Sequence, residues 1–251
     1  MGLAAAFDDA GDYGVVELEF AGADGSLRRV PLEACGGVRF EDTAPVRSFR
    51  WSRGQQHFPG WWWLATAGRH VGYESWLERD HLMMLDFDPA VTAVSSQPFW
   101  MHWKNGKRAR RHAPDFFARL AGGTGVVIDV RADDRIEPED AEAFDMTARA
   151  CAAADWEFRR VGVIAPFLAA NVRWLSRYRH PRCAGRPEVA GALRRAFAAP
   201  VCLSAGAAAA GDSLAVLPAV FHLMWCRVLA ADLASGPLAM SSMVWLEAGA
   251  R

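Results

Sequence analysis

Lysine is almost missing from this sequence: of the 28 basic residues only two, Lys104 and Lys107, are lysines. The chain also has no excess of either charge, because 29 acidic residues bring the formal net charge to −1. A balanced chain has no general attraction for nucleic acid, so any such binding has to come from a local cluster of cations.

Cysteine and histidine patterns that would bind zinc are also missing. The five cysteines are odd in number and widely spaced, and none forms a CxxC pair. This argues against a disulfide framework and favours a reducing compartment. The seven histidines show no HxH or HExxH spacing, and neither GxSxG nor a GKS or GKT phosphate loop is present. Zinc hydrolase, serine hydrolase and P-loop chemistry are therefore not expected.

Long apolar segments are absent as well. The first residues carry no basic region followed by an apolar run, as a signal peptide requires. The longest apolar stretch, residues 214–226, contains Pro218 and His222 and is too short to cross a bilayer. We therefore expect a cytoplasmic protein without membrane contact.

What is present is the composition of a folded protein, with 52% hydrophobic and 23% charged residues. The periodicities predict a helix, three or four strands, a helix and a strand, which indicates an α/β core over about residues 60–165. The predicted segments are hairpin strands 14–20 and 25–31, a strand 61–66, a helix 71–87, strands 91–95 and 97–103, a hairpin 112–134, a helix 137–154 and a strand 156–164.

After Pro166 the composition shifts toward alanine and arginine. Helical patterns cover residues 167–178, 187–198 and 213–226, and two short strand-like runs follow. Helices followed by two short strands suit a small winged-helix module. We therefore divide the chain into an N-terminal β-hairpin extension (1–46), a central α/β domain (47–165) and a mainly helical C-terminal module (166–251).

In the predicted hairpin HAPDFFARLAGGTGVVIDVRADD, Asp115 stands near the start of the first strand and Asp129 near the end of the second. Because strand side chains alternate, Val127, Asp129 and Arg131 share one face, and Val126, Ile128 and Val130 share the face toward a helix. In the simplest register Asp115 on the first strand approaches Asp129. Two such carboxylates repel each other unless a cation lies between them, and Mg²⁺ prefers oxygen ligands of this kind.

Two further acids lie on the preceding helix, in ESWLERDHL. Glu74 and Glu78 are four residues apart and so project from one helix face. Taken alone, such a pair more often forms a solvated surface. The order of a glutamate helix, a PD strand and a strand with an acid two residues before a basic residue changes that balance.

This order resembles the PD-(D/E)xK nuclease superfamily, and more narrowly the TnsA-type endonuclease subunit of heteromeric cut-and-paste transposons. The narrower resemblance is carried by YESWLERDHLMMLDFDPAVTAVSSQPFWMHW, RRHAPDFFARL and VVIDVRADDRI, and it covers residues 47–165. It implies a restriction-endonuclease-like core, with a central mixed sheet flanked by helices.

The resemblance also assigns roles to single residues. Glu78, Asp115 and Asp129 match the acids of the catalytic and metal-binding set, and Arg131 stands where the family has its catalytic lysine. Arginine keeps the positive charge but cannot act as a base. Glu74 and Gln97 match supporting positions.

A basic run, KNGKRARRH, directly precedes the PD strand. It is either a solvated hairpin loop or a set of phosphate contacts beside the site. For the aromatic segment RWSRGQQHFPGWWW we expect core or partner contact in preference to base stacking. The candidate DNA-binding residues of the basic run are Lys104, Lys107, Arg108, Arg110 and Arg111, with His112 at its end.

The function that the resemblance implies is a Mg²⁺-dependent DNA endonuclease, with Mn²⁺ as a substitute metal, that hydrolyses one strand at transposon ends. Its implied partners are the DNA, a DDE-type transposase and an AAA+ ATPase regulator. Two alternatives stay open. One is a weakened or non-catalytic assembly or DNA-binding subunit with the same fold, and the other is a stand-alone restriction or repair nuclease.

Overall fold

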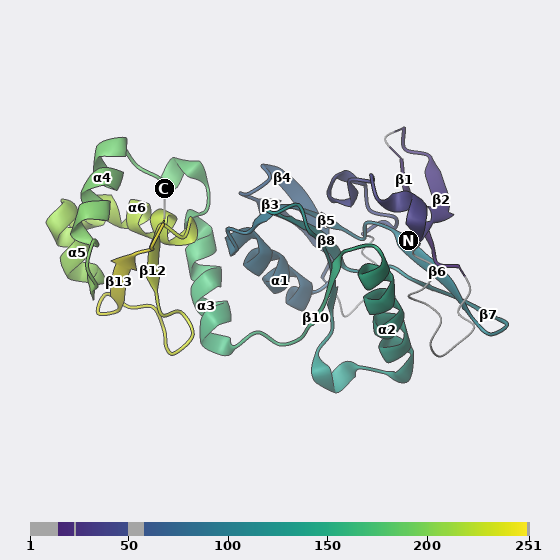
Figure 1. Cartoon of the computed structure of the whole chain (residues 1–251). Helices are drawn as coiled ribbons and strands as arrows, with labels where there is room; N and C mark the ends of the chain where they lie inside the picture. Colours follow the sequence, from purple (N-terminus) through teal and green to yellow (C-terminus); the bar gives the residue numbers. More distant parts are fainter. Residues whose placement is uncertain (1–14, 23, 50–57, 250–251) are drawn as a thin grey trace. The chain divides into compact units, whose positions relative to one another are not determined.

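The computed structural model describes residues 15–22, 24–49 and 58–249 of a mixed α/β protein. The chain divides into two compact units, Met1–Leu85 with Ala90–Val163, and Asp86–Pro89 with Ile164–Arg251 (Figure 1). The predicted division at 165/166 lies near the end of the first unit. The residues on both sides of the predicted boundary at 46/47 belong to that one unit. Predictions for residues 1–14, and for residues 50–57 of the aromatic segment, lie outside the described residues.

A four-stranded mixed sheet forms the centre of the first unit. Its strands run in the order β10-β9-β8-β5, with β9 and β10 parallel and the other neighbours antiparallel. The parallel pair is joined through helix α2, as a parallel crossover requires. The bounds are Val91–Ser96 for β5, Phe116–Leu120 for β8, Gly125–Val130 for β9, Pro138–Ala153 for α2 and Glu157–Val161 for β10.

Both faces of this sheet are covered, and the alternation along β9 decides what each face contacts. Val127 packs with Phe117 in the core cluster that contains buried residues of α2. Val126 and Ile128 pack in the other cluster with Leu82 of α1, Trp76–Phe87 (Figure 1). The predicted distribution of β9 side chains between two faces is therefore confirmed.

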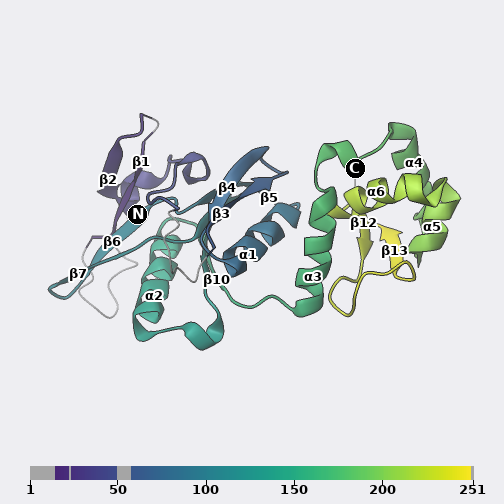
Figure 2. The ribbon, with the colours of Figure 1, turned by 180° about the vertical axis from the view of Figure 1, so that it is seen from behind.

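A second sheet, in the order β2-β1-β6-β7, is antiparallel throughout. The predicted N-terminal hairpin is confirmed, and its strand β1 pairs with β6. The hairpin of β6 and β7 projects from the body of the first unit, as both views show (Figures 1 and 2). The bounds are Glu17–Ala21 for β1, Leu27–Pro31 for β2, Trp100–Asn105 for β6 and Arg108–His112 for β7.

The basic run is therefore mostly strand, and five strands stand between α1 and α2 where three or four were expected. Gly106 and Lys107 form the two-residue turn, and Gly106 adopts a φ of 57° that favours glycine. The predicted strand 97–103 begins only at Trp100, because Gln97 has a left-handed backbone with φ of 46°.

The helix predicted over residues 71–87 starts later than expected. Strand β4 (Arg69–Tyr73) pairs with β3 (Gly60–Leu64), so Val71 and Tyr73 belong to a strand. Their apolar side chains fit both a helical and an alternating pattern, and the pairing with β3 decides between them. Of the tryptophans on β3, Trp62 packs against the core whereas Trp61 is 58% exposed.

The second unit consists of helices and a three-stranded antiparallel sheet in the order β11-β13-β12. The predicted helices 167–178, 187–198 and 213–226 correspond to α3 with a short 3-10 turn, α4 and α6. Helix α5 was not predicted, because its LSAGAAAA stretch is too short and too rich in alanine to show a polar face. The bounds are Pro166–Leu175 for α3, Pro187–Ala196 for α4, Val201–Cys202 for β11, Leu203–Ala210 for α5, Ser213–Trp225 for α6, Leu229–Ala231 for β12 and Met243–Leu246 for β13.

Among the described residues, no single helix has the length and apolar character to cross a membrane. Only helices α5 and α6 taken together are long and apolar enough, and this pair is bent by 116°.

Candidate functional site

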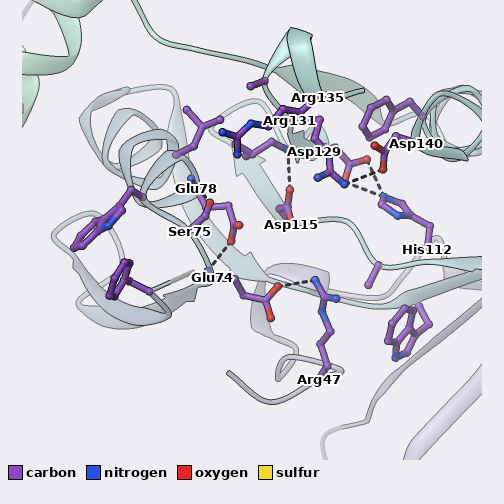
Figure 3. Close-up of a pocket in the computed structure, with 18 of the residues that line it drawn as sticks. Arg47, Glu74, Ser75, Glu78, His112, Asp115, Asp129, Arg131, Arg135 and Asp140 are labelled. Carbon is purple, nitrogen blue, oxygen red and sulfur yellow. Dashed lines mark hydrogen bonds and ion pairs between the residues drawn. The ribbon is translucent and has the colours of Figure 1, made fainter. Parts of the chain in front are cut away.

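A cavity of about 630 Å³ opens in the first unit where α1 and α2 begin, beside the start of β8 and the end of β9 (Figure 3). It contains the acids that the sequence analysis selected, together with several arginines and aromatic rings. The residues that line it include Arg47, Phe58, Glu74, Ser75, Trp76, Glu78, Trp100, Arg111, His112, Asp115, Asp129, Arg131 and Asp140.

The register of β8 and β9 brings Asp115 and Asp129 to the same end of the hairpin. The paired residues end with Phe116 and Ile128, Asp115 directly precedes β8, and the charge of Asp129 acts on Asp115. The Val130 amide donates a hydrogen bond of 2.7 Å to Asp115 Oδ2 and fixes that carboxylate (Figure 3). The expected approach of Asp115 to Asp129 is therefore observed.

Asp129 is buried and is held by a histidine. His112 Nε2 lies 2.9 Å from Asp129 Oδ1 and 3.0 Å from Oδ2. Only 2% of Asp129 is exposed, so this contact satisfies a carboxylate that water does not reach. In the sequence, His112 is recognisable only as the end of a basic run. The pairing joins residues 17 positions apart on different sheets, and no local pattern indicates it.

Glu78 belongs to the cap of α1 as well as to the cavity. Ser75 Oγ accepts a hydrogen bond of 3.1 Å from the Glu78 amide, and Glu78 Oε2 accepts one of 2.7 Å from the Glu74 amide. A serine followed three residues later by glutamate is the sequence of a capping box, which is visible here as SWLE. The cap holds one oxygen of Glu78 and orients the carboxylate.

The carboxylates of Glu78 and Asp129 lie close enough to Asp115 for their charges to repel its own. Burial raises the pKa of Asp115 well above its usual range, and the charges of Glu78 and Asp129 raise it further. Burial also raises the pKa of Glu78. Figure 3 shows Asp115 between the other two acids. A cation beside Asp115 would relieve this repulsion.

Arg47 supplies one positive charge that the sequence analysis did not identify. Its Nη2 lies 2.8 Å from Glu74 Oε2, and its charge lowers the pKa of both Glu78 and Asp115. Glu74 therefore holds an arginine at the cavity, which is a supporting position. Because Arg47 precedes Glu74 by 27 residues, only the tertiary structure shows the pair.

Arg131 does not point its charge at the three acids. Its Nη2 donates a 2.8 Å hydrogen bond to Asp140 Oδ1, and 46% of its side chain is exposed. Asp140 also caps α2 by accepting the Glu137 amide at 3.1 Å. Arg131 therefore ties the end of β9 to the first turn of α2, and it lines the cavity from that position.

Gln97 supports the site through its backbone. Its amide donates a hydrogen bond of 2.9 Å to the Asp115 carbonyl, and its carbonyl accepts one of 2.9 Å from Val46. The residue is buried and its side chain is not among those that line the cavity. Gln97 therefore positions the start of β8 and has a structural role.

The five candidate DNA-binding residues differ in their surroundings. Lys104, Lys107 and Arg108 are exposed on the β6–β7 hairpin. Arg110 lies 3.1 Å from Glu142 and 3.6 Å from Glu139 of α2, so its charge is compensated within the protein. Arg111 lies over the Trp100 ring at 4.3 Å and lines the cavity.

The donor set fits a hard divalent cation in its chemistry. Glu78, Asp115 and Asp129 offer carboxylate oxygens, which Mg²⁺ and Mn²⁺ prefer. A cation would also reduce the repulsion between Asp115 and the other two carboxylates. Within the described ranges, however, no three His, Cys, Asp or Glu side chains already stand in a group that could hold a metal. Binding would therefore require the side chains to converge.

Comparison with known proteins adds no further assignment, because no family model and no curated protein matches this chain.

Proposed function

We propose that this chain is a metal-dependent DNA endonuclease of the PD-(D/E)xK superfamily, of the TnsA type, which hydrolyses one strand at transposon ends. The observation that carries the proposal is the gathering of Asp115, Asp129 and Glu78 in one cavity, where the charges of the other two acids act on Asp115. The order of α1, strands, α2 and β10 around a mixed sheet supports a restriction-endonuclease-like core.

The residues of the chain would divide the work of hydrolysis among them. Glu78, Asp115 and Asp129 would hold Mg²⁺ or Mn²⁺, which when bound polarises a phosphodiester and lowers the pKa of water. His112 holds the Asp129 carboxylate, and the Val130 amide holds that of Asp115. Arg47 and Arg111 would offset the negative charge of the phosphate.

The test is metal-dependent nicking of transposon-end DNA. We expect Asp115→Asn and Glu78→Gln each to lower the nicking rate about a hundredfold or more, by analogy with the loss of one transition-state contact. Asp145→Asn is the matched control, because Asp145 is an exposed carboxylate paired with Arg149 on α2. Unchanged nicking in both site variants would remove these acids from the mechanism.

A second candidate is an assembly or DNA-binding subunit with the same fold and little activity. The pairing of Arg131 with Asp140 favours it, since the charge at the lysine position is directed away from the acids. Here Arg131→Lys should create nicking where the wild type has none, because a lysine amine can reach the cavity without the Asp140 pair. If the wild type already nicks DNA and Arg131→Lys adds nothing, this candidate fails.

The order of helices and strands in the second unit supports the proposal that it is a winged-helix module, which would contact protein partners. Helices α4 to α6 are followed by strands that complete the sheet β11-β13-β12. Helix α6 contains neither lysine nor arginine, and Leu214 on it is 82% exposed. Such a helix suits a DDE-type transposase or an AAA+ ATPase better than a phosphate backbone.

A further inference from the structure

Two aromatic rings lie exposed at the cavity beside the helix that carries Glu78. Phe58 is 53% exposed and Trp76 is 50% exposed, and their ring centroids lie 5.8 Å apart with an interplanar angle of 33°. Large apolar rings gain free energy when they are covered, so rings exposed around a cavity indicate a ligand surface. Both residues line the cavity that contains the three acids.

Cations lie beside two of the aromatic rings that line this cavity. The Arg79 guanidinium, which also pairs with Asp80 at 2.8 Å, lies 4.2 Å from the Trp76 ring centroid. Trp100, another residue of the cavity lining, has Arg111 at 4.3 Å and Arg47 at 5.8 Å from its ring. A ligand that covers these rings would therefore meet positive charge at the same time, which suits an anionic ligand with a flat face.

A nucleotide has both properties. Its base stacks on aromatic rings and its phosphate pairs with guanidinium groups, and such stacking is nearly independent of base identity. In duplex DNA the base faces are covered by their neighbours, so only an unstacked base presents a free face. An acidic peptide would satisfy the arginines, whereas a nucleotide would also bring a flat face to the exposed parts of the Trp76 and Phe58 rings.

We propose that this cavity binds a nucleotide whose base is unstacked, against Trp76 and Phe58, next to the phosphate that lies at the acids. The inference rests on the proposed function and names its substrate as DNA that is single-stranded or locally open at the cleavage position. Trp76 is two residues from Glu78 on α1, so a stacked base would set the position of the adjoining phosphate.

The experiment measures fluorescence anisotropy of a labelled single-stranded oligonucleotide and of the matching duplex, with the full chain in EDTA. We expect the single strand to bind more tightly than the duplex. Trp76→Leu should weaken single-strand binding about 5- to 150-fold, whereas Trp76→Phe, which keeps a ring, should stay within about threefold. Phe58→Leu tests the neighbouring ring in the same way.

The matched control is Trp61→Leu. Trp61 is 58% exposed on β3 and contacts Phe49, but it does not line the cavity. Its substitution should leave single-strand binding unchanged. The thermal midpoint of each variant shows whether it is folded, and Phe58→Leu keeps the inference testable if Trp76→Leu does not fold.

The outcomes separate this inference from the proposed function. If the wild type nicks DNA with Mg²⁺ but Trp76→Leu binds single strands as the wild type does, the stacking site is wrong and the nuclease stands. If single-strand binding depends on Trp76 while nicking is never seen, the stacking site stands and the nuclease activity is wrong. An equal loss of duplex and single-strand affinity in Trp76→Leu would overturn the inference, because an unstacked base would then not be the feature recognised.

Discussion

At the scale of single residues, the negative charge of Asp115 serves the cavity but lowers the stability of the fold. Its carboxylate is held by the Val130 amide, yet burial and two neighbouring acids oppose its charge. Three carboxylates at one cavity repel one another and so do not stabilise the fold. Such destabilising clusters of charged groups are typical of functional sites.

We predict that Asp115→Asn stabilises the protein in EDTA. Because the folded-state pKa of Asp115 is raised from its usual value of 3.8, the folded protein binds the proton more tightly than the unfolded chain does. Its stability therefore falls as pH rises from about 4 through the raised pKa. The asparagine variant lacks this fall, so urea unfolding at several pH values should show the difference growing toward neutral pH. Equal stabilities at neutral pH would contradict the prediction.

His112 should contribute to stability through its contact with Asp129. His112→Ala leaves the buried carboxylate without this partner, and we expect a loss of about 1.5–3 kcal/mol in the free energy of unfolding. His70→Ala is the control, because His70 is exposed on β4 and should change stability by no more than about 0.5 kcal/mol. A His112 variant as stable as the control would mean that Asp129 finds another partner.

At the scale of elements, the hairpin of β8 and β9 sets the spacing of Asp115 and Asp129. Gly125, the first residue of β9, lies against two aromatic rings. A Cβ at this position would come within 2.6 Å of Phe117 Cζ and 2.9 Å of Trp156 Cδ1. Close packing at the start of the strand therefore helps to hold the register on which the site depends.

We expect Gly125→Ala to lower the free energy of unfolding by about 1–3 kcal/mol, because the rings must move to accept the methyl group. Gly122→Ala, in the preceding turn, is the matched control, since a Cβ there would meet nothing within 4 Å. Chemical denaturation of the two variants distinguishes them. Similar midpoints would show that Phe117 and Trp156 shift at no cost.

At the scale of the whole molecule, the acids of the cavity come from three elements of the first unit, whereas the second unit has a core of its own. A metal bound by these three acids should therefore stabilise the first unit. Leu193, fully buried on α4, offers an independent change in the second unit.

Calorimetry should show that the metal and a substitution in the second unit act on different unfolding transitions. Mg²⁺ or Mn²⁺ at about one hundred times its Kd should add about 2.7 kcal/mol and raise one unfolding transition by roughly 5–10 °C. Leu193→Ala should lower the other transition through a loss of about 2–5 kcal/mol, without changing the metal response. A metal shift that persists in Asp115→Asn would show that the ion binds elsewhere.

Much of the architecture follows from local patterns. The alternation of apolar residues along β9 is enough to predict which side chains meet each core cluster, and the order of Glu78, Asp115 and Asp129 is visible in the chain itself. Helix α2 was predicted almost to its ends, since Pro138 suits a first helical turn. These features depend on residues a few positions apart, so short-range physics determines them.

Other features were decided only by the tertiary structure. The stretch Val71–Tyr73 became strand because β3 lies beside it, and Arg131 turned toward Asp140 because α2 begins there. The contacts of Arg47 with Glu74 and of His112 with Asp129 likewise join distant positions. The sequence by itself determined which acids are available and on which faces they lie. The folded chain alone decided which partners hold them, because those partners come close only when separate elements pack.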